Sequence, residues 1–199
     1  MNPGVVLAGN KIFLNDIEID YSKLNLEPFK TETRKVINFD CGNQSLNEFL
    51  TSDEVFNYEN EKLGTTTLVY FEGELVAYYT TSGYLLKKIK MKSAKGFSKF
   101  SEYRIEGFPS ILIGRLAVQN EWKGKGIGRY LVTKIIRDTY NSSGKFGLRL
   151  VVVQAKEEAF DFYIKLGFQF IEHSSEDKRF KAKGTRGMFF DLKSLQTLK

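Results

Sequence analysis

Three glycines at alternate positions, Gly124, Gly126 and Gly128, are the residues in this chain whose spacing points most clearly to chemistry. The apolar run at residues 111–118 precedes them and predicts a buried strand, and apolar residues at helical spacing from Ile127 onward predict an amphipathic helix. A glycine loop between a strand and a helix lets the main chain approach an anion closely. The first helical turn then offers unpaired N–H groups and the positive end of the helix dipole. The segment therefore predicts a phosphate-binding site.

The spacing of the loop argues against two common nucleotide-binding motifs. A P-loop requires Ser or Thr after its lysine, and Gly126 follows Lys125 here. A dinucleotide fingerprint has the order G-x-G-x-x-G, whereas this loop has G-x-G-x-G. Another phosphate-containing ligand is expected.

A second strand and helix follow at residues 148–170. Residues 148–155 are almost wholly apolar and predict a buried strand. The next apolar positions share one face of a predicted helix, and Gly167 is placed to end it. The residues on that face are Ala159, Phe162, Tyr163 and Leu166.

Residues 111–170 together resemble the two acyl-CoA signatures of the GNAT N-acetyltransferases. The first signature has Arg or Gln, two residues, Gly, one residue, and Gly or Ala, which here becomes Lys123, Gly126 and Gly128. Lys123 departs from the pattern but retains the positive charge. In the family the pantetheine arm lies between two splayed strands, and the tyrosine in the position of Tyr163 sits near the CoA sulfur. Lys156 occupies the position of a frequent asparagine.

This resemblance implies acetyl-CoA as cosubstrate and Tyr163 as the catalytic acid. A tyrosine with its ordinary pKa of about 10 is protonated at neutral pH and can donate a proton to a departing thiolate. The strand at residues 111–118 contains no Asp or Glu, so the resemblance implies a water-mediated base or an amine that arrives neutral. The residues implied to bind acetyl-CoA are Leu116, Ala117, Val118, Lys123, Gly124, Lys125, Gly126, Ile127, Gly128, Arg129 and Lys156.

The fold that the resemblance implies is α/β. It is a single GNAT domain over residues 1–199, with a twisted mixed sheet of about six or seven strands, splayed central strands and flanking helices. Ser45 and Glu48 predict a capping box for a helix, and the runs on either side of Glu72 and Gly73 predict a hairpin. A basic segment within residues 87–108 is predicted to be a surface insertion, and a second basic run precedes a closing strand.

Length and residue composition limit the classes of protein to which the chain can belong. The 199 residues suit one domain, and residues 1–10 lack the features of a signal or membrane segment, so a cytoplasmic protein without a membrane association is expected. Cys41 is the only cysteine and is expected to be a small buried residue. His173 is the only histidine and has no cysteine nearby, so no metal site is predicted.

The acceptor remains open at this stage. Residues 39–50, the predicted hairpin and residues 111–118 resemble, more loosely, GNAT toxins that acetylate aminoacyl-tRNA, and the net charge of +6 would favour such a polyanion. A protein amine or a small amine is the alternative acceptor. A noncatalytic regulator that binds CoA or RNA is the alternative of a different class. An antitoxin partner and a homodimer are two further hypotheses, and the sequence leaves both open.

Overall fold

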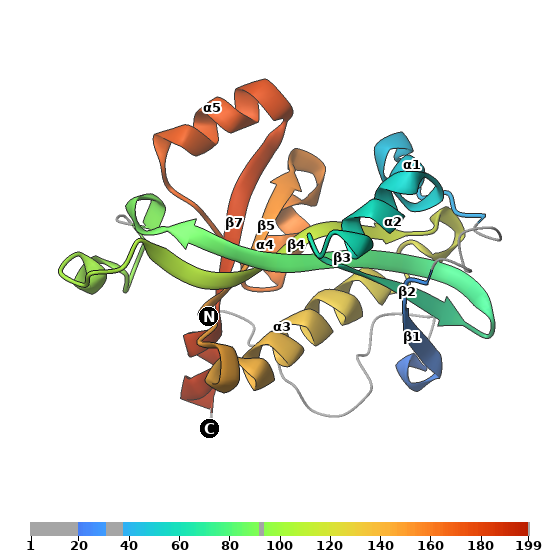
Figure 1. Cartoon of the computed structure of the whole chain (residues 1–199), viewed down its shortest axis with the longest axis horizontal. Coiled ribbons are helices and arrows are strands. Elements are labelled where there is room, and N and C mark those ends of the chain that lie inside the picture. The colour runs from blue at the N-terminus through green and yellow to red at the C-terminus, as the bar shows by residue number, and fades with distance from the viewer. Residues whose placement is uncertain (1–19, 31–37, 92–93, 199) are drawn as a thin grey trace. The chain divides into compact units, whose positions relative to one another are not determined.

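The structure is a computed structural model that describes residues 20–30, 38–91 and 94–198. Residues 1–10 and Lys92 of the basic segment lie outside these ranges. Seven strands are hydrogen-bonded in the order β1-β2-β3-β4-β5-β7-β6. Figure 1 shows the ribbon, with β1 to β5 and β7 labelled. This mixed sheet with helices confirms the predicted α/β fold class.

The chain forms two compact units. The first contains Met1–Ser82 and Gly114–Thr133, and the second contains Gly83–Ile113 and Lys134–Lys199. Each unit has its own apolar cluster of buried side chains. Three elements contribute residues to both units: β3 (Glu74–Lys87), β4 (Gly107–Val118) and α3 (Ile127–Phe146).

An antiparallel meander organises the first unit. It consists of β1 (Leu24–Pro28), β2 (Thr65–Phe71) and the first part of β3, and the short 3-10 helix η1 (Tyr21–Lys23) precedes it. The turn between β2 and β3 has positive φ values at Glu72 and Gly73, 50° and 86°. Two such residues match the twist of the flanking strands. The predicted hairpin is therefore confirmed.

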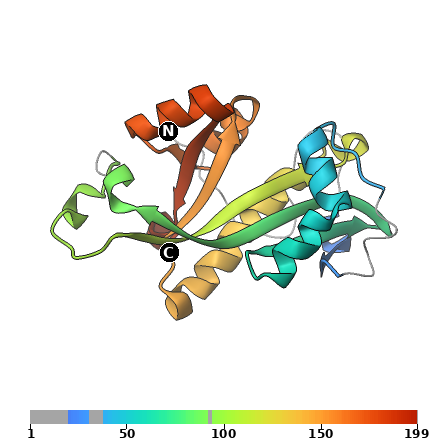
Figure 2. The same ribbon diagram turned by 45° about the horizontal axis from the view of Figure 1, so that its top comes forward.

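Two short helices, α1 (Gln44–Thr51) and α2 (Asp53–Asn60), lie beside this hairpin, as Figures 1 and 2 show. The two helices pack against the hairpin because this contact removes their apolar side chains from water. Phe49 and Leu50 of α1 and Val55 of α2 are almost fully buried and join Leu68 and Tyr78 of the sheet in one cluster.

The predicted capping box at the start of α1 is wrong. Asn43 caps the helix: it has an extended backbone, and its side chain accepts a hydrogen bond from the Leu46 N–H at 3.2 Å. Ser45 lies inside the helix, and Glu48 accepts from the Gln44 side chain at 2.6 Å. Asn is as good an N-cap as Ser, so composition alone does not rank the two sites.

The second unit surrounds β5 (Leu150–Lys156). This strand runs parallel to β4 over Ser110–Ile113 and antiparallel to β7 (Thr185–Asp191). The short β6 (Gln169–Phe170) pairs with the outer side of β7. The other elements of this unit are η6 (Glu157–Ala159), α4 (Phe160–Lys165), α5 (Ser174–Lys183) and η7 (Leu192–Leu198).

The basic segment between β3 and β4 contributes to the core of the second unit. It contains two 3-10 helices, η3 (Lys88–Met91) and η4 (Ser98–Phe100). Met91 and Phe97 are buried, and Phe97 contacts Phe108 and Phe189 edge to face at 5.1 and 5.7 Å. The segment therefore contains buried apolar side chains as well as lysines.

The second basic run forms helix α5, which the sequence analysis did not predict. The His173 side chain accepts from the Ser175 N–H, acidic residues occupy the first turn, and Gly184 ends the helix with a φ of 64°. These are the capping and charge preferences of a helix. Figure 2 shows α5 beside β7, with which it is in contact. No helix in the described ranges has both the length and the apolar character needed to cross a membrane.

Candidate functional site

The glycine loop of the first unit has the geometry of an anion cradle. Gly124 and Gly126 have φ values of +77° and +81°, which side chains with a Cβ rarely adopt, and a Cβ on Gly124 would have nothing within 4 Å. Helix α3 begins at Ile127, and the Tyr130 N–H donates to the Gly126 carbonyl at 3.0 Å. The N–H groups earlier in that turn have no acceptor within the helix. They are available to an anion such as a pyrophosphate.

An aromatic pair supports the loop from η1. The ring of Tyr21 stacks on that of Tyr130, with centroids 4.8 Å apart and planes 3° from parallel. The Tyr21 hydroxyl donates to the carbonyl of Lys125 at 3.3 Å. Burial raises the pKa of Tyr21, and the positive charge of Arg129 partly offsets this rise. No local pattern in the sequence indicates this support, because Tyr21 and the residues it contacts are more than 100 positions apart.

The three cations that the sequence placed at the loop differ in the structure. Lys123 donates its ammonium hydrogen to the carbonyl of Cys41 at 2.7 Å, and the Lys125 ammonium lies 4.3 Å from the centre of the Trp122 ring. Arg129 makes no ion pair or hydrogen bond with any residue that the structure describes. Among the described residues, Arg129 is the cation of this loop for which no such contact is seen.

The end of β4 leads into the loop through a hydrogen-bonded corner. Ala117 is buried in the first core, whereas Leu116 and Val118 are partly exposed. The Asn120 N–H donates to the carbonyl of Asp40 at 2.9 Å. Hydrogen bonds from the Gly42 N–H and the Asn47 side chain lower the pKa of Asp40. The corner is thus a fixed polar network, which the sequence did not reveal.

Tyr163 lies in the second unit, on α4. Its side chain is buried, with its ring edge to face against Phe162 at 5.0 Å and tilted by 66° against Phe168 at 5.2 Å. Burial raises the pKa of Tyr163 well above its ordinary value, so the hydroxyl keeps its proton at neutral pH. That hydroxyl has no hydrogen-bond partner in the described ranges. Lys156, at the start of η6, is exposed and makes no side-chain cap bond.

Arg115 of β4 is a candidate site residue that sequence analysis missed. Its guanidinium lies 3.5 Å from the centre of the Phe49 ring and forms an ion pair with Glu54 at 2.6 Å. Residues 111–118 of β4 contain no acidic residue, as the sequence showed, but Glu54 of α2 places a carboxylate beside Arg115 of this strand. No local pattern in the sequence points to this pair, because its two residues are 61 positions apart.

Other polar residues have structural explanations. Cys41 is buried and free, as expected, and its thiol donates to the Asn47 side chain at 3.1 Å. Glu102, Glu106 and Glu121 are exposed. In the described part of the chain no cluster of three His, Cys, Asp or Glu side chains could hold a metal ion.

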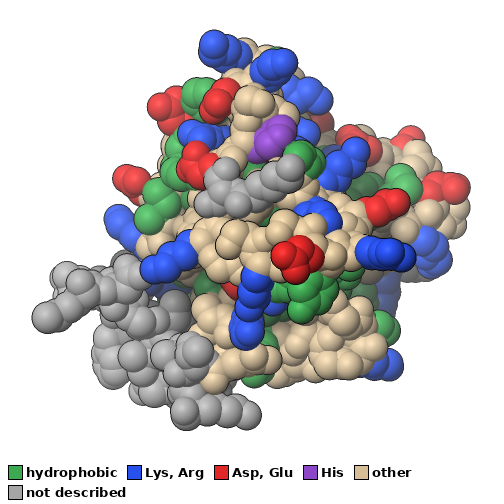
Figure 3. All heavy atoms as spheres, turned by 90° about the vertical axis from the view of Figure 1, so that its left-hand side faces the viewer, with side chains coloured by type: hydrophobic (Ala, Val, Ile, Leu, Met, Phe, Trp, Pro, Cys, Tyr) green, Lys and Arg blue, Asp and Glu red, His purple; other side chains and the backbone are tan. Residues whose placement is uncertain are grey.

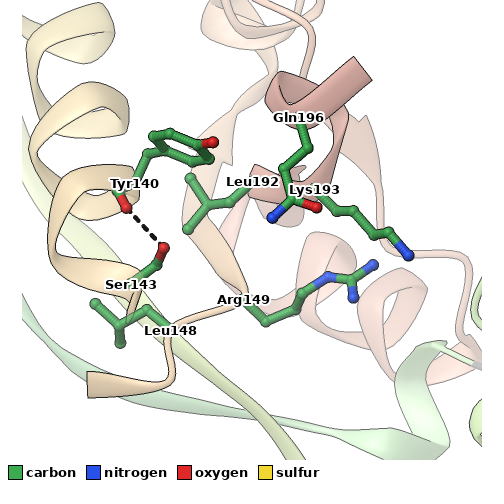
Figure 4. A pocket seen from close by; sticks show the side chains of 7 residues that line it. All are labelled: Tyr140, Ser143, Leu148, Arg149, Leu192, Lys193 and Gln196. Atoms are coloured by element: carbon green, nitrogen blue, oxygen red, sulfur yellow. Dashed lines mark hydrogen bonds between the residues drawn. The ribbon is translucent and has the colours of Figure 1, made fainter. Parts of the chain in front are cut away.

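A cavity in the second unit has no residue in common with the predicted site. Its volume is about 160 Å³, and it lies at the end of α3. Figure 4 shows the lining side chains: Tyr140, Ser143, Leu148, Arg149, Leu192, Lys193 and Gln196. The Arg149 guanidinium donates two hydrogen bonds of 2.8 Å to Asp191, so its charge is already neutralised.

Comparison with known proteins identifies the family. An Acetyltransferase (GNAT) domain matches residues 64–170. The tRNA-acetylating toxin of Mycobacterium tuberculosis (strain ATCC 25618 / H37Rv) is 26% identical over 136 residues, which cover 67% of this chain and 78% of that protein.

Solved structures show the same likeness. AtaT complexed with acetyl-methionyl-tRNAfMet has a TM-score of 0.71 and 25% identity, over 88% of this chain and 98% of that one. A mutant AtaT toxin bound to the C-terminus of the antitoxin AtaR and acetyl-CoA has a TM-score of 0.64 and 26% identity, over 88% and 97% of the two chains. Since the matched domain spans more than half of its 199 residues, this chain belongs to the GNAT acetyltransferase family.

Proposed function

We propose that the protein transfers acetyl from acetyl-CoA to the α-amine of aminoacyl-tRNA and acts as a translation toxin. The observation that carries this proposal is the likeness, over nearly nine tenths of the chain, to AtaT complexed with an acetylated aminoacyl-tRNA. The tRNA-acetylating toxin of Mycobacterium tuberculosis supports the same acceptor. This activity belongs in the cytoplasm, where charged tRNA is found.

The first unit supplies the contacts for acetyl-CoA. The N–H groups of Gly124 to Arg129 hold the pyrophosphate at the start of α3, and the guanidinium of Arg129 neutralises its charge. The backbone of Leu116, Ala117 and Val118 aligns the pantetheine amides. Lys123 and Lys125 hold the loop in shape, while Gly128 keeps the first turn of α3 free of a side chain and Ile127 anchors it in the core. Lys156, which belongs to the second unit, is exposed and contributes positive charge toward the cofactor in this proposal.

The chemistry requires a neutral amine and a stabilised leaving group. Acetyl-CoA supplies a thioester whose C–S bond breaks as the C–N bond forms, and the proton lost by nitrogen balances the one gained by sulfur. Tyr163 donates its hydroxyl hydrogen toward the departing sulfur. Because burial raises its pKa, the phenolate left after this proton transfer does not persist, and Tyr163 recovers a proton through water. The amine proton leaves through water.

An antitoxin completes the proposed system. The AtaT toxin has been solved bound to the C-terminus of the antitoxin AtaR, and we infer a corresponding inhibitory partner for this chain. We also infer a homodimer, and light scattering of the purified protein would test it.

Transfer of radiolabelled acetyl to defined acceptors tests the proposal. We expect labelling of charged tRNA, no labelling of the same tRNA after deacylation, and little labelling of a peptide that carries both an α-amine and a lysine. Efficient labelling of the peptide but not of charged tRNA would assign the enzyme to protein amines. Failure to label any amine, with acetyl-CoA binding intact, would favour a noncatalytic regulator.

A further inference from the structure

The short helix η1 contacts the glycine loop through the side chain of Tyr21. Tyr21 is 6% exposed, and its ring stacks on that of Tyr130 in the first turn of α3, with centroids 4.8 Å apart. Its hydroxyl donates to the carbonyl of Lys125, inside the loop, at 3.3 Å. One side chain therefore contacts both the loop and the helix whose N–H groups are proposed to hold the pyrophosphate.

The carbonyl that Tyr21 holds belongs to the peptide between Lys125 and Gly126. A trans peptide is planar, and its C=O and N–H groups point in opposite directions. The hydrogen bond from Tyr21 to the carbonyl therefore directs the Gly126 N–H away from Tyr21. This N–H has no acceptor among the described residues, whereas the Gly126 carbonyl accepts from the Tyr130 N–H at 3.0 Å. The Gly126 N–H is thus available to an anion.

The loop backbone by itself does not decide which way this peptide faces. Rotating the peptide plane by half a turn changes chiefly the ψ of Lys125 and the φ of Gly126. Gly126 has a φ of 81°, and glycine adopts positive and negative φ values about equally readily. The rotated peptide would present its carbonyl oxygen, with its partial negative charge, to the anion. A contact from outside the loop must select the orientation that donates, and Tyr21 supplies that contact.

Tyr21 can select an orientation because its own position is fixed by the sheet. Helix η1 leads directly into β1, where Leu24 pairs with Phe71 of β2. The Phe71 ring lies 5.1 Å from the Trp122 ring, and the Lys125 ammonium lies 4.3 Å from the centre of the Trp122 ring. Lys125 is thus held at its carbonyl by Tyr21 and at its side chain by Trp122.

We propose that Tyr21 is a positioning residue for acetyl-CoA, because it sets the orientation of the peptide between Lys125 and Gly126 and thereby directs the Gly126 N–H at the pyrophosphate. The inference rests on the pyrophosphate site proposed above and not on the identity of the acceptor. In this role Tyr21 acts through the peptide and makes no contact with the cofactor. Its hydrogen bond of 3.3 Å is longer than the usual O–H···O distance of about 2.7–2.8 Å, so removing it should have a modest effect.

Tyr21→Phe is the main test, because phenylalanine keeps the stacked ring and removes only the hydroxyl. We expect the dissociation constant and KM for acetyl-CoA to rise about threefold to tenfold, as for the loss of one hydrogen bond, while kcat at saturating acetyl-CoA stays unchanged. Tyr21→Leu also removes the stacked ring and should raise KM further. Calorimetry gives the dissociation constant without any acceptor, and steady-state kinetics with any accepted amine gives KM and kcat.

NMR of the Gly126 amide separates positioning from a general effect on the fold. A proton on an N–H group that begins to donate to a phosphate oxygen moves downfield. The Gly126 proton should therefore move downfield when acetyl-CoA binds to the parent protein, and the movement should be smaller in Tyr21→Phe at saturating acetyl-CoA. If this proton does not move in the parent, or moves equally in the variant, the proposed orientation is wrong.

Tyr70→Phe is the matched control. Tyr70 lies on β2 in the same unit, and burial raises its pKa as it raises that of Tyr21. The Tyr70 hydroxyl makes no hydrogen bond with a described residue. Acetyl-CoA affinity and kcat in this variant should therefore equal those of the parent.

Acetyl-CoA affinity in three variants separates this inference from the site on which it rests. Reduced affinity in Gly124→Asp together with parent affinity in Tyr21→Phe would overturn the role of Tyr21 and leave the loop as the pyrophosphate site. Parent affinity in both variants would remove the loop from the cofactor site, and the role of Tyr21 with it. An equal reduction in Tyr21→Phe and Tyr70→Phe would indicate a loss of packing and would also overturn the role of Tyr21.

Discussion

At the scale of single residues, two glycines allow the effect of backbone conformation on stability to be measured separately from an effect on ligand binding. Gly124 and Gly184 both have positive φ values, 77° and 64°, and a Cβ on either would meet nothing within 4 Å. Replacing either by Asp should therefore cost similar stability, about 1 kcal/mol. Only Gly124→Asp adds a negative charge to the proposed pyrophosphate site. We expect acetyl-CoA affinity, measured by calorimetry, to fall at least tenfold in that variant and to stay unchanged in Gly184→Asp.

The outcome for this pair is decisive for the loop. Equal acetyl-CoA affinity in folded Gly124→Asp and parent protein would remove Gly124 from the cofactor site. A similar reduction in both variants would indicate a general effect on the fold.

Tyr163 can be tested against another buried tyrosine. Tyr163→Phe should keep acetyl-CoA affinity and lower kcat about 10²- to 10⁴-fold, the usual contribution of a positioned acid. Tyr78, whose pKa burial also raises, donates to the Leu46 carbonyl at 2.7 Å, so Tyr78→Phe should lose about 1 kcal/mol of stability and little activity. Because the pKa of Tyr163 is raised, its deprotonation should not lower kcat at any pH below about 10. A kcat within threefold of the parent would make Tyr163 a packing residue.

At the scale of secondary-structure elements, one buried ion pair joins the basic segment to α5. The Glu176 carboxylate is fully buried and accepts hydrogen bonds from the Lys90 ammonium at 2.6 Å and from the Gly187 N–H at 2.9 Å. Gly187 has no side chain because a Cβ would stand 2.7 Å from that carboxylate. The contact therefore fixes η3, α5 and β7 together.

Breaking this pair from one side should destabilise the second unit strongly. Lys90→Met leaves a buried carboxylate without its cation, which typically costs about 3–5 kcal/mol, and the Lys90→Met, Glu176→Gln double variant should recover part of that stability. The exposed pair between Lys23 and Glu72, at 3.1 Å, is the control, and Lys23→Met should cost less than about 1 kcal/mol. Urea denaturation measures both. Similar destabilisation by the two lysine replacements would show that burial does not strengthen the Lys90 pair.

Element by element, the sequence predicted what local patterns encode. The hairpin was predictable because Glu72 and Gly73 separate two apolar runs, and α3 because its apolar spacing follows the glycine loop. Helix α5 was not, because most of its residues are polar and its one fully buried side chain is the acid Glu176. The pairing of Arg115 with Glu54 joins residues 61 apart in sequence, and such contacts leave no local signal.

At the scale of the whole molecule, the chain has a net charge of +6, but its basic side chains are not equally free to contact a polyanion. In the basic segment, Lys90 is held by Glu176, and Lys88 donates to the carbonyls of Ser101 and Tyr103 at 3.3 and 2.7 Å. On the face in Figure 3, basic and acidic side chains are interspersed, and Lys and Arg gather at the top, where α5 lies. The exposed lysines of α5 are Lys178, Lys181 and Lys183.

These three lysines make a test of tRNA binding that leaves the core intact, because none forms an ion pair or hydrogen bond with a described residue. Replacing all three by Ser should weaken tRNA binding and reduce the slope of log K against log salt by up to about 0.9 for each phosphate that the variant no longer neutralises. Replacement by Arg keeps the charge and should keep the slope, while acetyl-CoA affinity should be unchanged in both variants. Equal slopes for the Ser variant and the parent would exclude α5 from the tRNA surface. If tRNA affinity is also independent of salt in the parent, phosphate contacts play no part in choosing the acceptor.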